Sequence, residues 1–86
     1  MFVFAVVLTE PTEETKRRIQ SHYPDYHELT PNVFLVSSEE FAKEVKAKIG
    51  IGADGADGVV FRLNHAYSGY TSRDTWEWLS RAEQMA

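Results

Sequence analysis

FVFAVVL, running from Phe2 to Leu8, is the stretch that decides the fold of this 86-residue chain. Every side chain in it is apolar, most are β-branched or aromatic, and Pro11 follows soon after. A short run that is apolar at successive positions predicts a strand buried on both faces. We therefore place this segment in the centre of a β-sheet that has a covering layer on each side.

A helix and a hairpin are predicted between this strand and residue 36. Pro11 suits the first turn of a helix, and the acidic residues around it favour the positive end of the helix dipole. The helix should end near His22, because the proline at position 24 disfavours helical backbone before it. Segments 26–29 and 33–36 are predicted as strands joined by a Thr-Pro-Asn turn.

A second helix is predicted after Ser37, which has the capping-box spacing to Glu40. Apolar residues then recur at helical spacing, with lysines on the opposite side, and Gly50 suits the end of the helix. The apolar positions are Phe41, Ala42, Val45 and Ile49.

The remaining elements complete an α+β fold. Segment 59–63 is a predicted strand, and Ser72 is expected to cap a last helix. The first six elements, β-α-β-β-α-β, have the order of the ferredoxin-like fold, here with an added C-terminal helix. Two helices should cover one face of an antiparallel sheet. The other face needs the C-terminal helix, a second subunit, or both.

Composition narrows the classes of function. The length predicts one domain, residues 1–86, and the net charge of −4 argues against non-specific nucleic-acid binding. The chain has no cysteine, which excludes disulfides and fits a reducing compartment, so we expect a cytoplasmic protein. The apolar run at 2–8 lacks the basic start and cleavage site of a signal peptide, and it is too short to span a membrane as a helix.

The glycine-rich loop carries a weak motif. Residues 50–55 match the G-x-G-x-x-G string of nucleotide-binding loops, but they follow a helix and precede a strand, which reverses the required order. Asp54 and Asp57 would repel phosphate, and they supply too few oxygen ligands for a calcium loop. We expect a plain surface turn and no cofactor.

The other polar residues that are candidates for catalysis or metal binding also lack suitable partners in the sequence. The three histidines show no i, i+4 pairing, and Ser68 lacks the strand–turn–helix setting of a hydrolase nucleophile, so we expect no catalytic residue and no metal. Acidic residues are interspersed among the basic ones on both predicted helices, which predicts a solvated, salt-bridged surface. The histidines are His22, His27 and His65, and the basic residues are Lys16, Arg17, Arg18, Lys43, Lys46 and Lys48.

The aromatic segment near the C-terminus is the predicted binding site. Tyr, Trp and Arg dominate binding hot spots, and five such residues crowd into it. They are Tyr67, Tyr70, Arg73, Trp76 and Trp78. Trp76 and Trp78 lie about 200° apart on a helix. Either one packs on the sheet while the other is partly exposed or meets a partner, or both belong to the core.

Four predicted elements together carry a family resemblance: the apolar first strand, the strand pair Tyr26–Val36, the helix after Ser38 and the strand Gly58–Leu63. In their order and apolar pattern they resemble the small ferredoxin-like proteins related to the CRISPR-associated adaptation nuclease. The resemblance implies a dimer. It also implies a metal bound by an acidic residue at the end of the first strand. Here that position reads Leu-Thr-Glu, so Glu10 is the candidate ligand.

Three functions follow from these observations. The first is a non-catalytic interaction or regulatory protein, acting as a homodimer or docking onto a larger protein. The alternative is a metal-dependent nuclease of the resembled family, with Glu10 near the metal. The third is small-ligand binding on an open face of the sheet.

Overall fold

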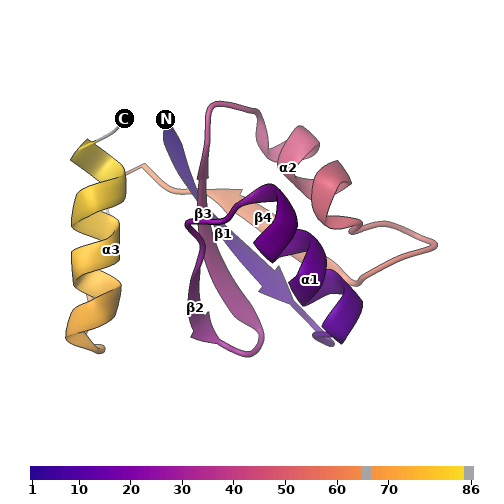
Figure 1. Ribbon diagram of the computed structural model, residues 1–86, viewed down its shortest axis with the longest axis horizontal. Coiled ribbons are helices and arrows are strands. Elements are labelled where there is room, and N and C mark those ends of the chain that lie inside the picture. The colour runs from indigo at the N-terminus through magenta and orange to yellow at the C-terminus, as the bar shows by residue number, and fades with distance from the viewer. Residues whose placement is uncertain (65–66, 85–86) are drawn as a thin grey trace.

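The first strand lies inside the sheet, as predicted. The computed structural model describes residues 1–64 and 67–84 and contains a four-stranded sheet in the order β2-β3-β1-β4 (Figure 1). Each neighbouring pair is antiparallel. The strands are β1 (Phe2–Leu8), β2 (His27–Thr30), β3 (Val33–Ser38) and β4 (Gly58–Arg62).

Within the residues that the structure describes, three helices cover the sheet from its two sides. They are α1 (Glu13–His22), α2 (Ala42–Ile49) and α3 (Arg73–Gln84). Figure 1 shows α1 and α2 on one face and α3 on the other. The element order, strand order and helix placement are those of a ferredoxin-like α+β fold with an added C-terminal helix, which confirms the predicted fold class.

The alternation of side chains along β1 divides the core into two layers. Phe4, Val6 and Leu8 pack with Ile19 of α1 and with α2. Val3, on the opposite side of the strand, packs with Leu35 and with α3. Successive residues of a strand face opposite sides, so a strand apolar at every position needs both layers. The α2 residues of the first layer are Val45 and Ile49, and the α3 residues of the second are Trp78, Leu79 and Ala82.

The start of α1 lies slightly later than predicted. Pro11 precedes the helix, and Thr12 is the N-cap residue. The Thr12 hydroxyl accepts a hydrogen bond from the Thr15 backbone N–H at 3.1 Å. A side-chain oxygen at this position satisfies one of the free N–H groups of the first turn, so Thr12 sets the helix start.

The predicted capping box at Ser37 is wrong. Pairing between β1 and β3 extends to Phe2 opposite Ser38, so both serines belong to the strand, and α2 begins only at Ala42. The backbone ladder with β1 therefore prevails over a local cap. Glu40 instead donates its backbone N–H to the Ser38 hydroxyl at 3.0 Å.

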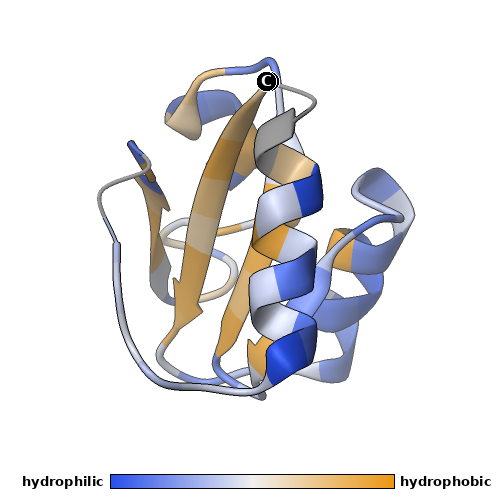
Figure 2. Cartoon of the chain, turned by 90° about the vertical axis from the view of Figure 1, so that its left-hand side faces the viewer, coloured by the Kyte–Doolittle hydropathy of each residue, from blue (hydrophilic) through white to orange (hydrophobic). Residues whose placement is uncertain are grey.

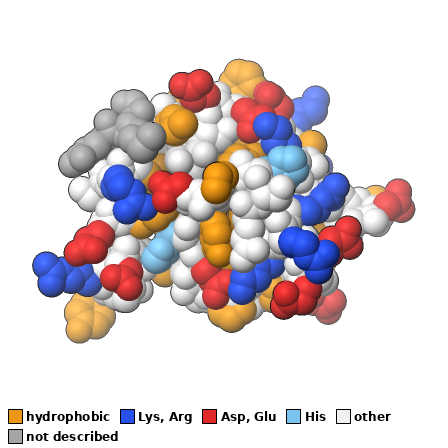
Figure 3. Space-filling view, viewed as in Figure 1, with side chains coloured by type: hydrophobic (Ala, Val, Ile, Leu, Met, Phe, Trp, Pro, Cys, Tyr) orange, Lys and Arg blue, Asp and Glu red, His pale blue; other side chains and the backbone are white. Residues whose placement is uncertain are grey.

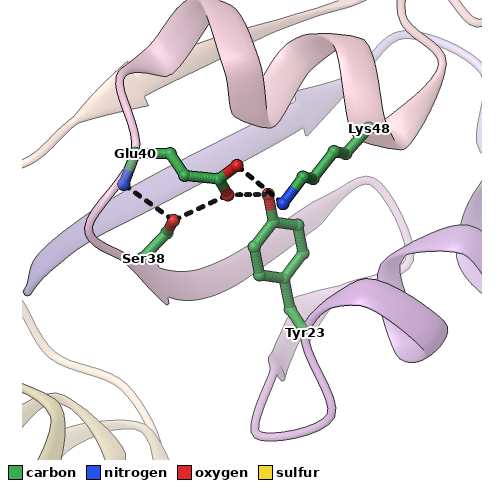
Figure 4. A network of polar contacts seen from close by, with 4 residues as sticks. All are labelled: Tyr23, Ser38, Glu40 and Lys48. Atoms are coloured by element: carbon green, nitrogen blue, oxygen red, sulfur yellow. Dashed lines mark hydrogen bonds and ion pairs between the residues drawn. The ribbon is translucent and has the colours of Figure 1, made fainter.

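A polar network joins the end of α1 to the entry of α2 (Figure 4). The Glu40 carboxylate accepts hydrogen bonds from the Tyr23 hydroxyl at 3.2 Å and the Ser38 hydroxyl at 2.9 Å. It also pairs with the Lys48 ammonium at 2.6 Å. The bonds from Lys48 and then Ser38 lower the pKa of the Glu40 carboxyl below its ordinary value. Burial, and then the nearby Glu40 carboxylate, raise the pKa of the Tyr23 hydroxyl, which stays protonated as a donor.

Gly50 ends α2 as predicted, in a left-handed conformation with φ of 90°. A β-carbon at this position would also meet the Arg18 guanidinium. At Gly58, the first residue of β4, a β-carbon would clash with the Val7 carbonyl oxygen. Glycine is therefore required at both positions for distinct reasons: backbone conformation at the first and close strand approach at the second. Over the described residues, no helix combines the length and apolar character needed to cross a membrane.

Candidate interaction surface

Polar contacts anchor α3 to β2 and to the segment that leads into it. The indole Nε1–H of Trp78 donates to the Asp25 carbonyl oxygen at 2.8 Å. Arg81 pairs with the Asp25 carboxylate at 2.9 Å, and Nε2 of His27 lies 2.8 Å from the Thr75 hydroxyl. Together with the apolar contacts of Trp78, these bonds hold the helix against the β2 side of the sheet.

A groove of about 440 Å³ lies between α3, the sheet and the segment that leads into the helix. The rings of Tyr67 and Trp76 stack at its wall, with centroids 6.3 Å apart and planes at 27°. Most of the lining surface is apolar, with hydroxyl groups from Ser68 and Thr75 among it. The apolar residues of the lining are Leu29, Leu35, Leu63, Tyr67, Tyr70, Trp76 and Leu79.

The structure separates the residues predicted to form one binding site. Tyr67, Tyr70 and Trp76 all line the groove, and Tyr70 is fully exposed. Trp78 is 4% exposed and belongs to the core. Arg73 lies on the outer surface of α3 and pairs with Glu77 at 3.1 Å. Between the alternatives for the two tryptophans, Trp78 packs inward and Trp76 is half-buried at the groove.

A second exposed apolar surface lies on β1 and β4, where α3 does not cover the sheet. Figure 2 shows hydrophobic strands uncovered beside α3. Val59 and Phe61 of β4 are 52% and 53% exposed, and Val7 of β1, opposite Val59 in the register, is 36% exposed. Sequence reasoning missed this surface. Residues 59–61 are apolar at every position, which signalled a strand with apolar side chains on both faces, but only the position of α3 decides which of those side chains stay exposed.

The glycine-rich loop forms a hollow of about 340 Å³ with the start of α1. Its charged lining includes Glu14 and Asp54 beside Arg18. Two carboxylates oppose the binding of a phosphate group, so the geometry gives no support to a nucleotide site.

The remaining polar candidates lie apart from one another. His22 is exposed on α1, whereas His27 contacts Thr75 and the Trp78 ring. Ser68 lines the groove. His65 lies outside the described residues. Glu10 is exposed just after β1, and within the described part of the chain no three His, Cys, Asp or Glu side chains gather as a metal site would require.

Charges on the face seen in Figure 3 are mixed. Basic and acidic side chains are interspersed over this side of the molecule. Ion pairs occur on the described surface, such as that of Lys16 with Glu28 at 3.0 Å. The Glu28 hydrogen bond and charge raise the pKa of the Lys16 ammonium. This arrangement agrees with the predicted salt-bridged surface.

Comparison with protein-family models gave no match, and neither curated proteins nor solved structures produced one.

Proposed function

We propose that this chain is a non-catalytic interaction domain that acts by associating with a second copy or by docking onto a larger protein. The observation that carries the proposal is the incompletely covered second face of the sheet. There Val7, Val59 and Phe61 leave apolar side chains in water, whereas α3 covers Val3 and Leu35 on the same face.

These exposed residues support the proposal because they adjoin one another. Val7 and Val59 are direct partners in the β1–β4 register, and Phe61 faces the same side two positions later. Leu63 continues that side and lines the groove at α3. Single exposed apolar side chains are ordinary, whereas a contiguous apolar surface on a sheet face is typical of a binding site.

Sedimentation equilibrium over a range of protein concentrations tests the proposal. The variant Phe61→Ser should weaken self-association by about tenfold or more, because a buried aromatic contact contributes about 1–3 kcal/mol to an interface. Phe41→Ser is the matched control: Phe41 is 72% exposed at the start of α2, on the other side of the sheet.

The expected result is weaker association for the Phe61 variant and unchanged association for the Phe41 variant. Equal effects of the two substitutions would contradict a role for the β4 surface. A wild-type chain that stays monomeric throughout the concentration range would contradict the homodimer form of the proposal.

A further inference from the structure

We infer that β4 pairs antiparallel with β4 of a second copy of this chain, with Val60 at the twofold axis, and joins two sheets into one of eight strands. The inference rests on the proposed function and specifies both its partner and its contact. It follows from the difference between the two sheet edges, from the direction of the β4 backbone groups and from the self-complementarity of the strand.

The two edges of the sheet differ in their protection against pairing. β2 has a register irregularity between Glu28 and Thr30, Pro31 follows it, and Lys16 covers Glu28 with an ion pair. Bulges, charges and prolines of this kind block the approach of another strand. β4 pairs with β1 in continuous register from Gly58 to Arg62, and its centre is Val-Val-Phe. The β4 edge is therefore the one open to pairing.

The hydrogen-bonding groups of β4 are directed suitably for this pairing. Leu63 donates its N–H to the Val3 carbonyl at 2.8 Å, and the Asp57 carbonyl accepts from Thr9 at 2.9 Å. In an antiparallel pair, residues alternate between bonding the partner strand and pointing away from it. Odd-numbered residues of β4 therefore bond β1, and the N–H and C=O groups of the even-numbered ones point toward the free edge. These are Gly58, Val60 and Arg62.

A second copy of β4, placed antiparallel along the free edge, provides a hydrogen-bonding partner for each of these backbone groups. With Val60 opposite Val60, Gly58 lies opposite Arg62, and each pair exchanges two N–H···O=C bonds. This register pairs all residues of the strand, whereas a shift by two positions leaves the strand ends unpaired. It also sets Val59 opposite Phe61 of the second copy, an aromatic–β-branched pair of the kind that stabilises sheets.

Charge favours the antiparallel direction. Asp57 precedes β4, and Arg62 is its last residue, so the strand carries opposite charges at its two ends. Antiparallel pairing brings Arg62 of each copy to the end where Asp57 of the other lies. The two side chains are on opposite faces of the sheet, so the attraction acts between the strand ends and forms no direct ion pair. A parallel arrangement would instead place like charges together, which costs free energy.

The first test removes one outward N–H. In the variant Val60→Pro, the lost N–H takes no part in the β1 ladder, and proline is tolerated on an edge strand at such a position. Association should weaken by about 100-fold or more, because two bonds across the axis are lost and each ring obstructs the partner backbone. Val60→Ala is the control, since it removes the side chain but keeps the N–H. Circular dichroism verifies that both variants fold.

The second test determines the register by disulfide crosslinking. Because the chain has no native cysteine, only the introduced cysteines can form a disulfide. Val59→Cys and Phe61→Cys are prepared separately, then mixed and mildly oxidised. In the inferred register these positions face each other about 4.5 Å apart between Cα atoms, within disulfide range. The mixture should form a crosslinked heterodimer, whereas each variant alone should crosslink at most weakly.

The outcomes separate the inference from the proposed function. A dimer that survives Val60→Pro as well as it survives Val60→Ala would overturn the inference, and so would one in which the mixed cysteines fail to crosslink. In both cases self-association itself would stand. A crosslink in either variant alone that forms as readily as in the mixture would also overturn the inferred register. A monomeric wild-type chain would overturn both the inference and the homodimer form of the proposal.

Discussion

Glu40 is the residue on which the polar network between α1 and α2 converges. Because Lys48 and Ser38 lower its pKa in the folded state, its contribution to stability is present above the ordinary glutamate pKa of 4.5 and is lost as pH falls through the lowered folded-state value. Glu40→Gln should therefore lower the free energy of unfolding by about 1 kcal/mol at neutral pH, and by less in acid.

Urea unfolding at several pH values measures this difference. Glu39→Gln is the control, because Glu39 is the exposed neighbour of Glu40 in the chain. A gap between wild type and the Glu40 variant that persists unchanged into acid would show that the carboxylate charge does not contribute.

The structural role of a single residue could be predicted from the sequence where only one residue type suits the position. Gly50 was predicted to end a helix because only its conformational freedom suits that place, and the φ of 90° agrees. Ser37 was misassigned because serine serves equally in a cap or a strand end. The pairing of Ser38 with Phe2, distant in the chain, decides between the two.

Trp78 contributes both apolar contact and a hydrogen bond to the packing of α3 on the sheet. Trp78 is buried and donates its Nε1–H to Asp25, whereas Trp76 is half-buried at the groove. Trp78→Ala should lower the free energy of unfolding by about 3–5 kcal/mol, the usual cost of truncating a buried aromatic residue. Trp76→Ala should lower it by clearly less. Denaturant unfolding compares the two, and equal losses would contradict the assignment of Trp78 to the core.

The order and type of the elements were predictable, but the coverage of the sheet was not. Apolar periodicity and turn residues identify each strand and helix locally, which is why the ferredoxin-like order emerged from the sequence. The exposure of Val59 and Phe61 depends on where α3 docks. That position is set by Asp25 and His27, which lie some fifty residues away in the chain.

For the whole molecule, self-association predicts that thermal stability depends on protein concentration. If only the folded chain associates, association stabilises the folded state by mass action. The wild-type melting temperature should therefore rise with protein concentration. In Val60→Pro the melting temperature should depend on concentration clearly less over the same range. Differential scanning calorimetry at several concentrations measures both. A wild-type value independent of concentration would contradict dimerisation coupled to folding.

The central position of β1 has a consequence for synthesis on the ribosome. Phe4 lies beside Val36 on one edge and Arg62 on the other, so both neighbours of β1 are made well after it. The emerging strand keeps two open edges and two apolar faces until most of the chain has followed. Long-range pairing of this kind slows folding, and until it is complete the strand exposes unpaired backbone N–H and C=O groups that can bind other chains. Nascent chains ending before residue 58 should thus engage chaperones more strongly than the finished domain.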